Sequence, residues 1–252
     1  MDNLLLETEA ELDKKYPSSD GIEMGESDLH SRWMIFLAEN LRYLYENHPS
    51  ISVHMDLFWY PVEGQPAIRR APDVMVLERP YSPRKSYRQW QEADVIPAVV
   101  IEIISESNND SEMRARRAWY KKYGVKEYYE FDEEEKTVKV WLLKEGKFVQ
   151  QKVSNTFTSP FMQVTFSWGG EITATMPNGE PFRTTSQIRH DWQQANLREM
   201  TLREQAEVER RRISEQAEEK QRRLRAEAEA EQQRLKAEAQ RLQSEAEAEQ
   251  RR

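Results

Sequence analysis

Apolar residues between positions 27 and 60 change their spacing at Pro49. Before this proline they recur at intervals of three and four residues, as in an amphipathic helix, and Ser27 is placed to cap that helix at its start. After the proline, every second residue from 51 to 59 is apolar, which is typical of a strand with one buried face. The pattern therefore predicts a helix that lies across a sheet, followed by a strand of that sheet.

Strand and helix signals continue to about residue 166. A strand is predicted over 72–77, and the nearly continuous apolar run over 97–104 predicts a central strand that is covered on both faces. A helix over 111–123 is expected to end at Gly124, a residue suited to the left-handed conformation that follows helices. Further strands are predicted over 125–131, 137–143, 147–153 and 162–166. We therefore expect an α/β domain built on a mixed sheet with flanking helices.

Three regions differ in character. Residues 1–25 are polar and contain a turn signal, so we expect a flexible lead-in. Residues 26–185 hold the strand and helix patterns and are expected to form the domain. Residues 79–93 within it are rich in Pro, Arg and Lys, and we interpret them as a surface excursion with local positive charge. Residues 186–252 are expected to form a charged helical tail.

The tail repeats every eleven residues. Leu202, Ile213, Leu224 and Leu235 hold one place in the repeat, and an alanine follows each of them by four residues. An eleven-residue period corresponds to about 3.67 residues per turn and favours a straight or slightly right-handed coil. Two interpretations stay open. The stripe is either a surface for self-association, giving a homo-oligomer, or part of a lone helix stabilised by Glu–Arg pairs of about 0.2–0.5 kcal/mol each.

Charge and composition limit the classes of function. The formal net charge is −8, and residues 1–189 carry 23 of the 37 basic and 30 of the 45 acidic residues. Such a domain is a poor non-specific binder of nucleic acid, which would need a local basic strip. The chain has no Cys, and it shows neither a signal peptide nor a run of about 20 apolar residues. We expect a cytoplasmic protein that does not bind a membrane.

Two carboxylates are candidates for chemistry. Glu102 lies inside the apolar run of the predicted central strand, where desolvating a charge costs several kcal/mol, in rough terms, unless it is paired or holds a cation. Asp73 lies at the start of another predicted strand, although Pro-Asp is often only a turn signal. Mg²⁺ prefers a few carboxylates together with water and substrate oxygens, so the pair could form half of such a site.

Three segments resemble the Uma2 family, also known as DUF820, over about residues 15–170. They are Pro72-Asp73-Val74, then Ile101-Glu102-Ile103-Ile104-Ser105, then 119–129 with its Gly-Val-x-Glu-Tyr sequence. Similar bacterial sequences are abundant in cyanobacteria and often continue into Glu/Arg/Ala-rich tails. The resemblance implies a restriction-endonuclease-like fold of the PD-(D/E)XK type. It also implies that Asp73 and Glu102 bind Mg²⁺ or Mn²⁺, with the backbone carbonyl of Ile103 as a further ligand.

The resemblance breaks at the lysine. In the simplest arrangement of the superfamily, a lysine follows the glutamate by two residues, and this chain has Ile104 at that position. Sequences similar to this one carry the lysine on the next helix instead, at the position where this chain has Arg116. Arginine keeps the charge and binds phosphate, but its pKa is too high for a base. Arg114 and Arg117 on the same helix, and His30 at the start of the first helix, are candidate substrate contacts.

Two functions follow from these observations. The first is a metal-dependent endonuclease that hydrolyses DNA with a metal-activated water. The second is a catalytically weakened or inactive member that acts as a binding or assembly module through its tail. A basic strip for DNA would combine Arg114, Arg116 and Arg117 with residues around the Asp73 strand, although each of these taken alone is better explained as solvated surface. The residues around the strand are Arg69, Arg70, Arg79, Arg84, Lys85 and Arg88.

Overall fold

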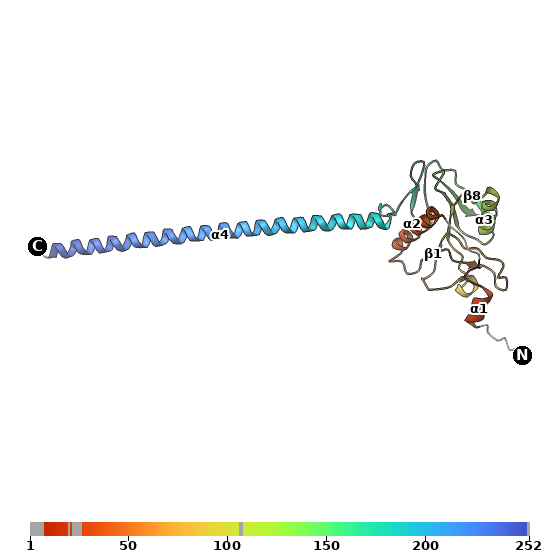
Figure 1. Ribbon diagram of the computed structural model, residues 1–252, viewed down its shortest axis with the longest axis horizontal. Helices are drawn as coiled ribbons and strands as arrows, with labels where there is room; N and C mark the ends of the chain where they lie inside the picture. The colour runs from red at the N-terminus through yellow and green to blue at the C-terminus, as the bar shows by residue number, and fades with distance from the viewer. Residues whose placement is uncertain (1–7, 20, 22–26, 106–107, 251–252) are drawn as a thin grey trace. The chain divides into compact units, whose positions relative to one another are not determined.

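The structure is a computed structural model that describes residues 8–19, 21, 27–105 and 108–250, with no side-chain description for 242–250 (Figure 1). The chain divides into two compact units, Met1–Thr184 and Thr185–Arg252. The first unit holds the sheets and all helices except the last one, and the second is that helix. Each unit is described by itself below.

A six-stranded sheet forms the centre of the first unit, in the order β1-β3-β5-β6-β7-β8. Neighbouring strands run antiparallel except β5 and β6, which run parallel and are joined by helix α3 (Asp110–Lys122). The predicted mixed sheet of an α/β domain is thereby confirmed. The strands are β1 (Ser52–Met55), β3 (Val74–Leu77), β5 (Val99–Ile104), β6 (Glu127–Asp132), β7 (Thr137–Lys144) and β8 (Lys147–Gln150).

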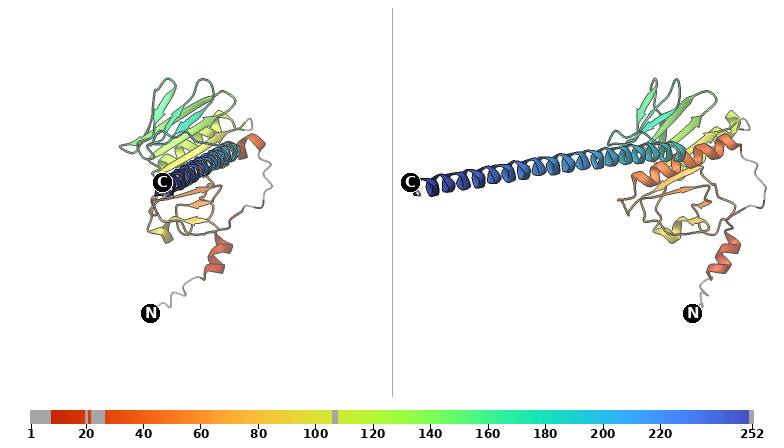
Figure 2. Two further views of the ribbon diagram at one scale, coloured as in Figure 1. Left: turned by 90° about the vertical axis from the view of Figure 1, so that its left-hand side faces the viewer. Right: turned by 60° about the vertical axis from the view of Figure 1, so that its left-hand side comes forward.

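Helix α2 (Asp28–Leu44) covers one face of this sheet (Figure 2). As predicted, it begins after Ser27, whose hydroxyl accepts the N–H of His30 at 3.2 Å. Its buried side, which includes Leu37 and Leu41, packs in one cluster with alternate residues of the central strands. The same cluster takes in a small sheet formed by β9 (Thr156–Thr158), β10 (Thr165–Ser167) and β11 (Thr173–Thr175).

Helix α3 supplies the opposite face. It ends at Lys122, and Gly124 follows with φ +84°, so the predicted glycine stop is confirmed. Tyr120 of α3 packs in a second cluster with Val100 of β5 and Tyr128 of β6. This cluster also contains residues of β2 (Trp59–Tyr60) and β4 (Tyr87–Arg88), a short parallel pair outside the main sheet. The turn of 3-10 helix η1 (Gln89–Glu92) follows β4 directly.

The strand predicted over 147–153 ends at Gln150, and two other predicted strands are interrupted or shortened by a left-handed residue. The strand expected over 51–59 is divided into β1 and β2, because Asp56 takes a positive φ of 46° and its N–H turns to the carbonyl of Pro72 at 3.1 Å. The strand expected over 162–166 begins only at Thr165, since Gln163 also has a positive φ, of 57°, and belongs to a turn. Alternation of apolar residues does not reveal either left-handed residue.

The expectation of an irregular lead-in is wrong for residues 9–15, which form helix α1 (Glu9–Lys15). Thr8 and Glu11 cap it reciprocally. Tyr16 then packs in the interior, where its hydroxyl accepts the N–H of Gly64 at 2.7 Å. The residues of the lead-in numbered 1–7, 20 and 22–25 lie outside the described part of the chain.

Helix α4 (Thr185–Gln250) is one continuous helix of 66 residues. The predicted long C-terminal helix is confirmed, and it begins one residue before the expected start at 186. Its described residues are almost all exposed. None of the helices in the described ranges is both long and apolar enough to cross a membrane.

Candidate active site

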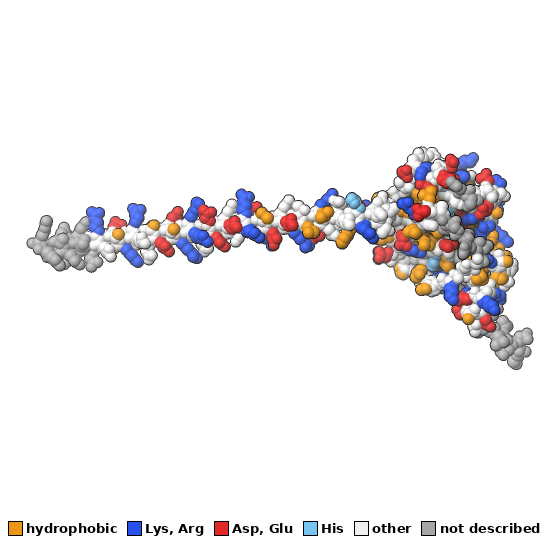
Figure 3. All heavy atoms as spheres, viewed as in Figure 1, with side chains coloured by type: hydrophobic (Ala, Val, Ile, Leu, Met, Phe, Trp, Pro, Cys, Tyr) orange, Lys and Arg blue, Asp and Glu red, His pale blue; other side chains and the backbone are white. Residues whose placement is uncertain are grey.

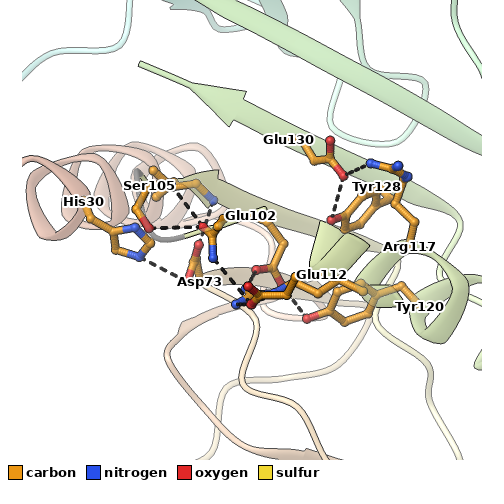
Figure 4. Close-up of polar contacts among 12 residues, drawn as sticks. His30, Asp73, Glu102, Ser105, Glu112, Arg117, Tyr120, Tyr128 and Glu130 are labelled. Atoms are coloured by element: carbon orange, nitrogen blue, oxygen red, sulfur yellow. Dashed lines mark hydrogen bonds and ion pairs between the residues drawn. The ribbon is translucent and has the colours of Figure 1, made fainter. Parts of the chain in front are cut away.

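Asp73 and Glu102 lie side by side on the α3 face of the sheet (Figure 4). Val74 pairs with Ile101 in the antiparallel ladder of β3 and β5, so the residue before Val74 comes next to the residue after Ile101. Alternation along each strand then directs Asp73 and Glu102 to the same face. Asp73 is 8% exposed and Glu102 is fully buried. The sequence thus brings two carboxylates together in the interior, at the end of the β3 ladder.

Asp73 is held by two groups from different elements. Its Oδ2 accepts the backbone N–H of Ile103 at 2.7 Å, and its Oδ1 lies 3.3 Å from Nε2 of His30 on α2. A strand residue directs its N–H and its carbonyl toward the same neighbour. The carbonyl of Ile103 is therefore directed toward the start of β3 as well. This arrangement puts a backbone oxygen beside the two carboxylates.

Glu102 has a protein partner on each of its carboxylate oxygens. Nη1 of Arg116 donates to Oε2, and the hydroxyl of Tyr120 donates to Oε1. Both partners come from α3, the helix that crosses from β5 to β6. Arg116 also donates from Nη2 to Glu112 one turn earlier, at 2.7 Å. Glu102 is thus a paired carboxylate, and Arg116 is shared between two acids.

Burial is the largest single influence on the pKa of Glu102 and on that of Arg116. Burial raises the pKa of Glu102, the charge of Asp73 raises it further, and Arg116 and Tyr120 oppose the shift without cancelling it. Burial lowers the pKa of Arg116, but Glu102 and Glu112 outweigh that effect and raise it above its usual range. Arg116 therefore stays charged, whereas Glu102 holds its proton more tightly than an exposed glutamate.

Another buried carboxylate, Glu130, lies opposite Glu102 in the parallel register of β5 and β6. It accepts from Arg117 of α3 and from the hydroxyl of Tyr128. Burial raises the pKa of Glu130, and Arg117 opposes the shift. Sequence reasoning missed this residue, although a glutamate within the apolar strand predicted over 125–131 carried the same signal as Glu102.

The predicted site residues are distributed as follows. Arg116 contacts Glu102, His30 contacts Asp73, and Ile103 donates its N–H to Asp73. Arg117 is directed to Glu130 on the next strand, and the side chain of Arg114 is exposed on α3. The structure therefore brings His30 and Arg116 to the carboxylate pair and leaves Arg114 and Arg117 away from it.

Metal binding can be judged from the donors present. Within the described ranges, no group of three or more His, Cys, Asp or Glu side chains is arranged to hold an ion. The candidate donors on the neighbouring strands are two carboxylates and one backbone carbonyl, from Asp73, Glu102 and Ile103. Hard oxygen donors in small number, with open positions for water and substrate, are what Mg²⁺ accepts. The residues fit such an ion as a partial site.

The expected positive charge of residues 79–93 is offset by ion pairs. Two acids from α1 and one from η1 contact its basic residues, and the side chains of Arg84 and Arg88 are almost fully buried. The pairs are Arg79 and Arg84 with Glu92, Lys85 with Asp13, and Arg88 with Glu9 and Asp13. These four residues therefore do not supply the basic strip, because Glu92 of the same segment and two acids of α1 are paired with them.

Comparison with known proteins identifies a family. Residues 4–175, more than half of the chain, match the model of the Uma2 family, described as "Putative restriction endonuclease". No curated protein matches. A solved structure that this chain resembles in part is that of a "putative nuclease belonging to DUF820 from Anabaena variabilis ATCC 29413". The two are 12% identical with a TM-score of 0.40, over 57% of this chain and 80% of that chain.

Proposed function

Because the chain belongs to the Uma2 family, we propose that its first unit hydrolyses phosphodiester bonds in DNA with the help of Mg²⁺ or Mn²⁺. One observation carries the proposal: Asp73 and Glu102, from neighbouring strands, lie together beside the backbone of Ile103. Two buried carboxylates that share one face cost folding energy, and a cation between them would offset that cost. A divalent cation bound there would stabilise charge on the phosphate and lower the pKa of a bound water.

Each residue of the site has a separate part in this proposal. Asp73 and Glu102 hold the cation through carboxylate oxygens, and Ile103 adds its carbonyl. His30, 3.3 Å from the Oδ1 atom of Asp73, keeps that carboxylate in place. Arg116 stays charged and offers a planar fork of donors to a phosphate oxygen, but it does not accept a proton from water.

Arg116 also competes with the cation. Its guanidinium is bonded to the Oε2 atom of Glu102, so a metal ion that uses this oxygen must displace it. Glu112 already accepts from the same guanidinium at 2.7 Å and remains as a partner after displacement. The arrangement predicts weak metal binding and slow hydrolysis. It also explains how Arg116 would become available to a phosphate once the cation is bound.

A nicking assay tests the proposal. Supercoiled plasmid DNA is incubated with the protein in Mg²⁺ or Mn²⁺, and in EDTA as the metal-free control. We expect nicking that requires the metal and falls about 100-fold in Asp73→Asn and in Glu102→Gln. Glu130→Gln is the matched control, because Glu130 is equally buried on the neighbouring strand but pairs with Arg117. Equal losses in all three variants would contradict the site assignment.

The second candidate function is a binding or assembly module without efficient catalysis. It is favoured by one specific observation, the arginine at the position where similar sequences have lysine, already engaged with Glu102. Arg116→Lys discriminates between the two candidates under the same metal conditions. Gain of nicking from near zero supports a weakened nuclease. If neither protein nicks DNA and titration calorimetry detects no Mn²⁺ binding to either, the module is the better description.

A further inference from the structure

A narrow apolar stripe runs along the second unit and is exposed to solvent. Leu202, Ile213, Leu224 and Leu235 recur every eleven residues of α4 and are 56–64% exposed. An alanine follows each of them by four residues. Figure 3 shows apolar side chains at intervals along this helix, among acidic and basic ones. Four large apolar side chains left in water at a fixed interval are a surface that burial would stabilise.

The period of eleven keeps the stripe on one side of the helix. Eleven residues make three turns at about 3.67 residues per turn, against 3.6 in a straight helix, so the stripe drifts by only about 20° per repeat. Successive large residues are then about 16 Å apart along the axis. A partner must present apolar groups at the same interval over the same length. A second copy of this helix has that interval by construction.

Charges beside the stripe favour a parallel orientation. Glu227 and Glu238 lie three residues after a stripe leucine, on one side, while Arg225 and Lys236 lie one residue after it, on the other side. Each acid and its corresponding base differ by two residues, or about 3 Å in height. Two parallel helices in register therefore place the acids of one opposite the bases of the other.

An antiparallel pair would bring the basic side against itself. That side carries Arg203, Arg225 and Lys236 and has no acid at the equivalent places. Like charges in such positions destabilise the pairing of helices. The acidic side also carries Arg212, Arg223 and Arg234, each one residue before a stripe residue. Arg212 and Arg223 are paired with Glu209 and Glu219 of their own helix. Charge thus favours the parallel orientation, and the eleven-residue apolar period favours a second α4 helix as the partner.

We propose that α4 binds the α4 helix of a second copy of this chain, parallel and in register, through the stripe of Leu202, Ile213, Leu224 and Leu235. This association goes beyond the nuclease function and does not depend on it. It places two copies of the first unit at the same end of a paired helix. A homodimer of this kind contains two copies of the candidate active site.

Cysteine cross-linking of the full chain tests both the partner and the orientation, because the chain has no cysteine of its own. Ala228→Cys introduces a thiol on the stripe, and Ala230→Cys introduces one two residues further, on the opposite side of the helix. A disulfide requires Cα atoms about 4.4–6.8 Å apart, which a parallel pair in register provides on the stripe. We expect mild oxidation to give a covalent dimer of the first variant and little of the second.

Sedimentation of the unmodified chain supplies the second measurement. We expect a concentration-dependent dimer that Leu224→Ala weakens about tenfold, with unchanged helical circular dichroism at low concentration. A monomer at all concentrations would overturn the proposal. Equal cross-linking of both cysteine variants, or a sedimenting dimer in which the Ala228→Cys variant fails to cross-link, would overturn the parallel register.

Discussion

Replacing Arg116 with methionine tests how far Arg116 offsets the free-energy cost of burying Glu102. Methionine keeps an unbranched, helix-compatible side chain but removes the guanidinium from the Oε2 atom of Glu102. Glu102 is fully buried and the Arg116 side chain is 22% exposed, so the contact is largely shielded from water. Removing one partner of a buried pair costs about 3–5 kcal/mol. Because Tyr120 still donates to the other oxygen, we expect about 3 kcal/mol, or a melting temperature lower by about 6–12 °C.

The loss of stability in Arg116→Met should depend on pH, because it depends on the charge of Glu102. Burial and Asp73 raise the pKa of Glu102 above 4.5, so the proton on Glu102 contributes stability that is full below pH 4.5 and lost as pH rises through the raised pKa. Arg116 stabilises only the charged form of Glu102. The variant should therefore lose most stability at about pH 8 and much less at about pH 5. Arg114→Met, an exposed position on the same helix, is the control and should change stability by less than about 0.5 kcal/mol.

Urea denaturation in EDTA at both pH values measures the loss, and a repeat in Mg²⁺ tests the competition between Arg116 and a cation. A ligand at 100 times its dissociation constant stabilises the native state by about 2.7 kcal/mol. Added Mg²⁺ should consequently stabilise the methionine variant more than the wild type. The methionine variant and the wild type are compared by their free energies of unfolding. A difference below about 1 kcal/mol at about pH 8, or an equal difference at both pH values, would refute the account of Glu102.

Three further predictions concern other contacts. Tyr120→Phe removes the hydroxyl that donates to Glu102 and should lower the free energy of unfolding by about 1.5–3 kcal/mol in urea, whereas a loss no larger than that of exposed Tyr43→Phe would contradict the contact. Thr8→Ala removes the cap of α1 and should cost about 1 kcal/mol, seen as faster amide exchange in residues 9–15; unchanged exchange would argue against the capped helix. Lys220→Leu extends the α4 stripe at a place that now holds a charge, and it should tighten self-association about tenfold by sedimentation, with weaker association counting against the parallel pair.

The elements of the fold could be predicted where a local pattern and the tertiary environment agree. The helix after Ser27 and the central strand around Glu102 both have strong apolar patterns, and both lie where expected. Helix α1 has no apolar stripe, and its one local signal is the Thr8–Glu11 capping box, which apolar periodicity does not detect. Its acids contact Lys85 and Arg88, more than 70 positions away, and such pairs cannot be seen in a periodicity.

The candidate site could be predicted in outline. Asp73 and Glu102 stand at the start and in the middle of predicted strands, and strand pairing is enough to bring them together. The partners of the arginines on α3 could not be predicted, because adjacent residues of a helix point in different directions. Arg116 is thereby directed to Glu102 and Arg117 to Glu130, and a rotation of the helix by about 100° would direct Arg117 instead of Arg116 to Glu102.

The ladder between β3 and β5 ends at a side chain. Its last backbone pair joins Val74 and Ile101, and the next N–H of β5 on that side, from Ile103, donates to the carboxylate of Asp73 at 2.7 Å. Asp73 therefore completes the sheet as well as supplying a carboxylate. Asp73→Ala would leave a buried amide of β5 without its acceptor, whereas Asp73→Asn keeps an oxygen in place for it, so only the asparagine variant separates loss of charge from damage to the sheet.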